Sequence, residues 1–125
     1  GVAAGQSTPA PATKAMVDHA YDVIRTGNPI AFFGMVFVLE GTSVAMATHG
    51  ADAVRKALNL PKNAFSYLTS HGSLDLEHLR FFENLMGTIT DPADQAAIIQ
   101  MAKDIFRLFA AMFAAIPMEP IHEAA

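Results

Sequence analysis

The chain has 125 residues, 52% of them hydrophobic, which supplies the core of one domain but is short for two. Twelve acidic residues against eight basic ones give a formal net charge of −4, and no cationic cluster occurs, so we expect no nucleic-acid partner. No cysteine is present, which excludes disulfides, thiolate metal sites and cysteine catalysis, and any metal must be held by His, Asp and Glu.

The two ends of the chain have no periodic pattern. Residues 1–13 carry no charge and predict a flexible linker or arm, residues 14–116 predict the helical domain, and residues 117–125 predict a tail. The longest wholly apolar run, Ile30 to Leu39, has ten residues, fewer than the roughly 18 of a membrane span. Nothing at the start resembles a secretory signal. We therefore expect a soluble, cytoplasmic protein with no membrane partner.

The first half of the domain predicts two helices. Apolar residues at spacings of three and four begin after Lys14 and stop at Gly27, which ends the first helix. Asn28 and Pro29 then provide an N-cap and a first-turn proline for a second helix, which runs to about Leu58. The first third of this second helix is apolar on every face, which predicts that protein surrounds it.

The second half predicts two more helices. The spacing of apolar residues indicates a third helix over Ala64–Met86, with Gly72 as a weak point in its middle. Asp91 and Pro92 indicate the start of a fourth helix, whose apolar stripe continues until Pro117. No β alternation and no phosphate-binding loop occur, so the predicted class is all-α, an antiparallel helical bundle with short connections.

A carboxylate stands out on the second helix. Glu40 directly follows the ten-residue apolar run, and an unpaired carboxylate in such surroundings costs several kcal/mol. It should therefore have a partner, which the sequence leaves open between a metal, an arginine and a hydrogen-bond donor such as Thr42, Ser43 or a tyrosine.

Three polar residues on the third helix form the second candidate. His71, Asp75 and His78 have i, i+4 and i+7 spacing, so a continuous helix places them on one face. Two imidazoles and a carboxylate suit iron, manganese or zinc, and such a metal would also neutralise Glu40. The same spacing also arises by chance on a surface helix, and a helix that began only at Ser73 would leave His71 in a loop.

These two segments resemble motifs of the haem-oxygenase-like di-iron oxidases and oxygenases, a family of iron-containing redox enzymes. The stretch from Gly34 to Val44 is similar to the family's apolar run followed by Leu-Glu-Gly-(Ser/Thr). The pattern His71-x3-Asp75-x2-His78 matches the spacing of its histidine, carboxylate and histidine ligands. The second motif is the specific one, because true haem oxygenases share the Leu-Glu-Gly segment.

The resemblance implies a seven-helix fold in which two iron ions, held by six side chains, activate dioxygen to oxidise a small organic molecule. By position, Glu40 would be a carboxylate ligand that bridges the irons, and His71, Asp75 and His78 would complete the ligands of this half. The implied cofactor is non-haem iron, as Fe2+, and manganese accepts the same ligands. A hydrophobic substrate pocket beside the metal would contain the following side chains: Phe33, Phe37, Val44 and Phe82.

The resemblance covers Lys14 to Ile116, which corresponds to the C-terminal part of the family's fold. The remaining ligands of the family come from a helix upstream, so we expect either a missing N-terminal segment or a self-associating chain. Because one side of the apolar helix would lack its cover, we expect a homodimer or a higher assembly.

Two alternative functions stay open. A haem-oxygenase-like enzyme that binds haem would need an axial histidine early in the chain, and His19 is the candidate. In a non-catalytic helical association module, the polar residues of the third helix would be structural.

Overall fold

The computed structural model describes residues 8–118, without the side chains of residues 72–76. Within this part of the chain there are four α-helices, two short 3-10 helices and no strand, which confirms the all-α class. The elements in chain order are α1 (Pro11–Thr26), η2 (Pro29–Ala31), α2 (Phe32–Leu58), η3 (Lys62–Phe65), α3 (Ser66–Met86) and α4 (Pro92–Ala114).

The first helix begins inside the segment predicted to be an arm. α1 starts at Pro11, three residues before Lys14, because a proline at the first helical position loses no hydrogen bond and already has a helical φ. The helix ends at Gly27 as predicted, where the Gly27 N–H donates to the carbonyl oxygen of Val23 at 3.0 Å. Asn28 then caps η2, since its Oδ1 accepts a hydrogen bond from the N–H of Ile30 at 3.1 Å.

α2 runs unbroken to the predicted end at Leu58 and is closed by Asn59, which has a left-handed φ of 49°. The expectation that protein surrounds its first third is wrong for the single chain. Phe32 and Phe37 are exposed, because α1, α3 and α4 cover only part of the helix circumference.

The three predicted ligands of the third helix, His71, Asp75 and His78, all lie within α3. It begins at Ser66 and continues through Gly72 to Met86. His71, Asp75 and His78 therefore belong to one continuous helix, and the alternative of a loop before Ser73 is wrong.

α4 begins where Asp91 and Pro92 predicted. The Asp91 carboxylate accepts a hydrogen bond from the N–H of Ala93 at 2.8 Å, which satisfies one of the free donors of the first turn. The helix ends at Ala114, three residues before Pro117.

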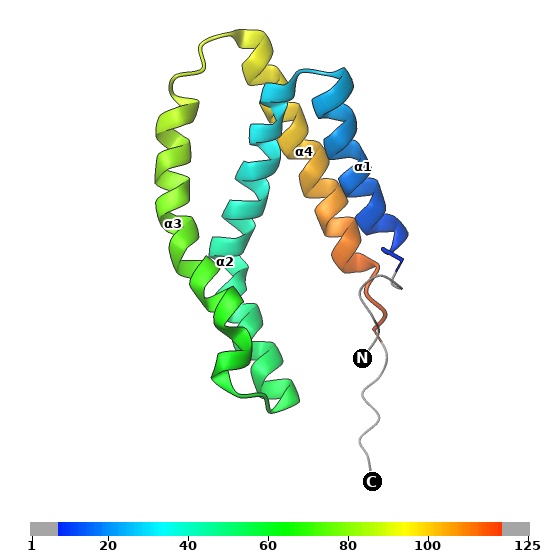
Figure 1. Cartoon of the computed structure of the whole chain (residues 1–125), viewed down its shortest axis with the longest axis vertical. Coiled ribbons are helices and arrows are strands. Elements are labelled where there is room, and N and C mark those ends of the chain that lie inside the picture. Colours follow the sequence, from blue (N-terminus) through cyan, green and yellow to red (C-terminus); the bar gives the residue numbers. More distant parts are fainter. Residues whose placement is uncertain (1–7, 119–125) are drawn as a thin grey trace.

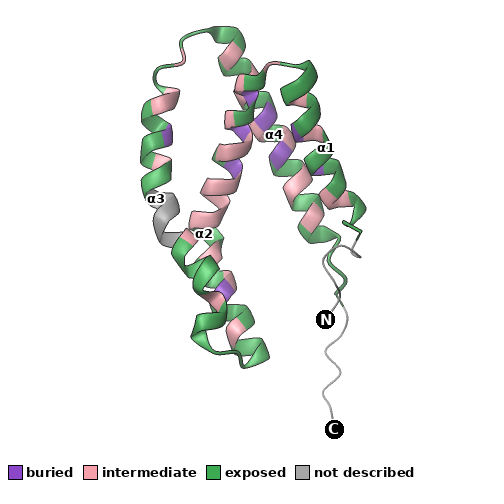
Figure 2. Ribbon diagram, in the orientation of Figure 1, coloured by how far each residue is buried: buried purple, intermediate pink, exposed green. Residues whose placement is uncertain are grey.

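The core lies where the first part of α2 meets α1 and α4. Figure 1 shows α1 and α4 side by side, with α2 between this pair and α3. In Figure 2 the buried residues gather around the meeting point of α1, α2 and α4, whereas α3 is mostly exposed. The buried hydrophobic side chains of this cluster are Met16, Ala20, Ala31, Val38, Met101 and Ile105. In the part of the chain that the structure describes, α3 packs against α2, and its backbone does not approach that of α4.

One helical segment has the length and composition of a membrane span. Pro29–Leu58 reaches a mean hydropathy of 1.8, because helical structure continues on both sides of the ten-residue apolar run. Only 17% of its most apolar window is buried inside the chain. The core helix of a soluble protein can pass the same test of length and composition, so this is weak support for a membrane location.

Candidate metal centre

The structure brings Glu40 of α2 and His78 of α3 together. The Oε2 atom of Glu40 lies 3.1 Å from Nδ1 of His78. The Glu40 side chain is 29% exposed and the His78 side chain 57%. The carboxylate at the end of the apolar run therefore has an imidazole partner, and both groups can be reached from solvent.

Aromatic packing sets the register that makes this contact. Phe82, one turn after His78, lies 6.0 Å from Phe37 and 6.1 Å from Phe33 between ring centroids. Phe37 is nearly one turn before Glu40 on α2. Because α2 and α3 are antiparallel neighbours, the Phe82 ring fixes which turn of α3 lies beside Glu40.

His71 has a different environment two turns earlier on α3. Its Nδ1 lies 2.9 Å from the carbonyl oxygen of Tyr67, and its ring lies 4.0 Å from the Tyr67 ring between centroids. A carbonyl oxygen only accepts, so Nδ1 carries the proton and a neutral ring has its lone pair on Nε2. A histidine that ligates a metal is commonly oriented in this way, with its other nitrogen donating to a backbone carbonyl.

The full predicted ligand set is not assembled among the described side chains. No group of three or more His, Asp or Glu side chains in that part of the chain is close enough to hold one ion. The side chain of Asp75 lies outside the described residues, so its position relative to the contact of Glu40 and His78 stays a prediction.

The separation of Oε2 of Glu40 and Nδ1 of His78 is that of a hydrogen bond, and it is also compatible with two neighbouring ligands of one ion. Ligand atoms about 2.1 Å from a metal and at right angles to each other are about 3.0 Å apart, and the observed separation of Oε2 and Nδ1 is 3.1 Å. A carboxylate and an imidazole are also donors that iron accepts. These residues fit an iron ion.

An apolar cavity of about 620 Å³ begins about one helical turn from this pair, and neither Glu40 nor His78 lines it. Its volume is within the range of roughly 300–1,000 Å³ usual for small-molecule sites. Phe37 and Phe82, two of the four residues predicted for a substrate pocket, line this cavity together with residues of α4. Phe33 contacts Phe82 edge-on, and Val44 is partly buried one turn after Glu40.

His19 lies on the opposite side of the molecule, between α1 and α4. Its Nε2 is buried, has no hydrogen-bond partner among the described residues, and is 3.7 Å from Oδ2 of Asp104. The cavity here has only about 190 Å³, below the size usual for small-molecule sites. This geometry does not favour His19 as the axial ligand of a haem.

Sequence reasoning missed Asp104, which is hydrogen-bonded within α4 and lies near His19 of α1. The Gln100 amide donates to both of its oxygens at 3.1 Å, and Arg107 also contacts it. The Gln100 hydrogen bonds, followed by the hydrogen bond and charge of Arg107 and by His19, hold the pKa of the Asp104 carboxyl below its ordinary value, although burial opposes them. The signal was a carboxylate within the apolar stripe of α4, the same signal that identified Glu40 on α2.

Comparison with known proteins gives one match. A family model described as iron-containing redox enzyme matches residues 3–110, which include all four predicted ligands. The search of curated proteins and the search of solved structures returned no match.

Proposed function

Because the chain belongs to the family of iron-containing redox enzymes, we propose that it is a non-haem iron oxidase or oxygenase whose metal is held by Glu40, His71, Asp75 and His78. The observation that carries this proposal is the 3.1 Å contact between Oε2 of Glu40 and Nδ1 of His78. Four side chains suffice for one ion, and a di-iron centre would draw further ligands from outside these residues.

Glu40 and His78 would form the anchor of the site, because they already lie at the separation of neighbouring ligands. His71 would offer Nε2, since Tyr67 holds the proton on Nδ1 through its carbonyl oxygen. The negative charge of Glu40, at the end of an apolar run, would favour a cation at this position over the apolar surroundings alone.

The apolar cavity near this contact supports the proposal that the substrate is a small organic molecule. Phe37 and Phe82 provide apolar walls on the side of the contact between Glu40 and His78. When bound, iron supplies the activation of dioxygen for oxidation of this substrate. The chain's own part is to orient the substrate against these walls, within one turn of the ligands on both helices.

An anaerobic titration of the full chain with ferrous iron tests the proposal. The wild type should bind iron, whereas His78→Ala should lose the binding and keep its helical circular dichroism, because His78 is an exposed residue on α3. His49→Ala is the matched control, since His49 is also an exposed helical histidine and lies outside the predicted ligand set.

Two results would overturn the assignment. Iron content in His78→Ala equal to that in the wild type would remove His78 from the ligands. A wild-type chain that binds no iron and melts at the same temperature with and without it would favour the non-catalytic association module.

A further inference from the structure

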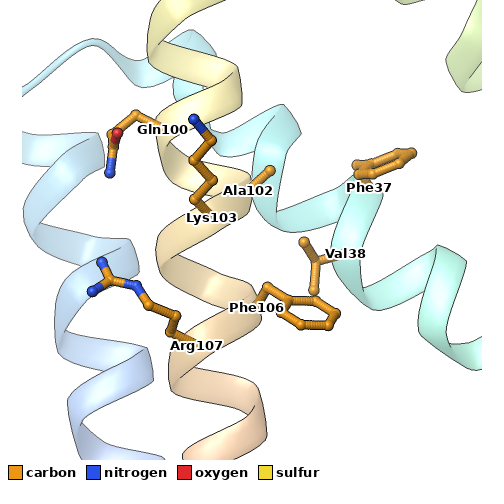
Figure 3. Close-up of a pocket in the computed structure, with 7 residues that line it drawn as sticks. All are labelled: Phe37, Val38, Gln100, Ala102, Lys103, Phe106 and Arg107. Atoms are coloured by element: carbon orange, nitrogen blue, oxygen red, sulfur yellow. The ribbon is translucent and has the colours of Figure 1, made fainter.

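Two adjoining cavities form a continuous groove between α3 and α4, with α2 at its base. The first is the cavity of about 620 Å³ lined by Phe37 and Phe82, and the second, of about 580 Å³, lies between α2 and α4. Figure 3 shows Val38 of α2 pointing toward Phe106 of α4, whereas the neighbouring Phe37 points away from them. We call this feature the α3–α4 groove. The residues that line both of its cavities are Phe37, Ala102 and Lys103.

The groove exposes large apolar side chains to solvent. Phe37 is 53% exposed, Ile99 is 55% exposed and Phe106 is 59% exposed. Phe37 lines both cavities, Ile99 lines the first and Phe106 lines the second, so the three side chains follow the length of the groove. Contiguous apolar patches of this kind mark surfaces that bind another molecule.

The exposed surface of the chain is large enough to form an interface with another molecule. The whole chain exposes 9353 Å², whereas a compact monomer of its mass exposes about 6,500 Å². When the end residues outside 8–118 are counted as fully exposed, about 900 Å² of this excess still remains. A standard protein interface buries about 800 Å² on each partner.

Charges on the two walls of the groove are opposite in sign. Glu83 stands on the α3 wall and Lys103 on the α4 wall, and neither forms an ion pair or a side-chain hydrogen bond within the described part of the chain. A two-fold axis places residue i against residue j and residue j against residue i. A groove with one acidic and one basic wall therefore complements itself.

We propose that a second copy of this chain covers the α3–α4 groove about a two-fold axis. Phe37 and Phe106 of both copies lie at the centre of the interface, and Glu83 of each copy faces the partner's Lys103. The groove then becomes an enclosed cavity.

Charge favours a second copy over a membrane as the cover. Glu83 and Lys103 both line the groove, and burial of such groups in lipid carries a high cost without a partner. The net charge of −4 also opposes contact with the anionic surface of a membrane. In a dimer the same two groups pair with each other.

The interface would also complete the surroundings of the candidate metal centre. Phe37 lines the groove nearly one turn before Glu40, so a partner over Phe37 removes water from the apolar side of the site. The dimer does not depend on iron, and its failure would leave the proposed ligands untouched.

Sedimentation velocity of the full chain tests the proposal. The wild type should have twice the chain mass of 13.3 kDa, and Phe106→Glu should have the mass of one chain, because a carboxylate then lies at the centre of the interface. Phe81→Glu is the matched control and should stay dimeric, since Phe81 is 70% exposed on α3 and lines neither cavity of the groove. A monomeric wild type, or a Phe106→Glu variant as dimeric as the control, would overturn the proposal.

Charge reversal gives a second test that leaves the apolar residues in place. Glu83→Lys alone puts cations on both walls and Lys103→Glu alone puts anions on both walls, so each should weaken self-association at least about tenfold. A mixture of the two single variants should form heterodimers, because a cationic groove then meets an anionic one. Failure of the mixture to associate more strongly than either variant alone would contradict the predicted contact.

Flotation with phosphatidylcholine vesicles distinguishes a membrane from a second copy. The wild type should stay with the soluble fraction. A wild type that floats with the vesicles, together with a Phe106→Glu variant that does not, would show that lipid covers the groove and would overturn the dimer.

Discussion

Gly34 on α2 lies directly against the main chain of Ala102 on α4. A Cβ atom built on Gly34 would be 2.6 Å from the backbone nitrogen of Ala102 and 2.9 Å from Cβ of Met101. The two helices cross at this point, and only a residue without a side chain allows the approach.

Gly34→Ala should therefore destabilise the fold. The added methyl group meets backbone atoms that cannot rotate away, so the free energy of unfolding should fall by about 1–3 kcal/mol, measured by urea denaturation. Gly50→Ala is the control on the same helix, because a Cβ there meets nothing within 4 Å. The control should be neutral or more stable by up to about 1 kcal/mol. Equal effects of the two substitutions would mean that the crossing is looser than described.

Phe82→Ala should detach α3. Phe82 is 8% exposed and is the aromatic contact of α3 with Phe33 and Phe37, so its removal should cost about 3–5 kcal/mol in free energy of unfolding. Hydrogen exchange of the α3 amides should rise more than that of α1 and α4. The adjacent Phe81→Ala should change stability by less than about 0.5 kcal/mol, because Phe81 is 70% exposed. Similar losses for both would argue against this packing.

Glu40→Gln should lower the affinity for ferrous iron without changing the fold. Glutamine keeps the size of the side chain and removes the negative charge, so we expect a loss of at least about tenfold in iron affinity with an unchanged melting temperature of the iron-free chain. Isothermal titration under anaerobic conditions measures the affinity. Unchanged affinity would place the ion away from Glu40, although His78 could still bind it.

Asp104→Asn should destabilise the chain at neutral pH but not in acid. The pKa of Asp104 is lowered in the folded state, first by the Gln100 hydrogen bonds and then by Arg107, so its carboxylate contributes stability above the unfolded pKa of about 3.9, and this contribution disappears as pH falls through the folded value. The variant should be less stable by about 1 kcal/mol at pH 7, and the difference should shrink below about pH 4 in urea denaturation. Asp52→Asn is the control, since Asp52 is 61% exposed. A difference independent of pH would contradict the role of the charge.

The helices of this fold were predictable because their ends carry local signals. The side chain of Asp91 caps α4, and that of Asn28 caps η2, as their positions before proline indicate. The start of α1 was predicted too late, because Pro11 follows small residues that gave no apolar periodicity. The continuity of α3 through Gly72 was open, since one glycine costs only about 1 kcal/mol and neighbouring contacts override it.

The candidate site was predictable in part. Spacing places His71, Asp75 and His78 on one helix face, but it does not say which side chain reaches α2, because the relative register of two helices depends on packing between them. Here the ring of Phe82 sets that register. The contact of His71 with Tyr67 depends on side-chain rotation within one helix, which a pattern of residue types does not specify.

The contact of Glu40 and His78 also helps to hold α3 against α2. Within the described residues the backbone of α3 approaches α2 and not α4, so the contact of Glu40 and His78 joins α3 to the helix that holds it in place. An ion that binds both Glu40 and His78 would stabilise the packing of α3 against α2, because it binds the packed arrangement and not the open one. At the proposed site, metal binding and the packing of α3 against α2 would then be coupled, and each should increase with the other.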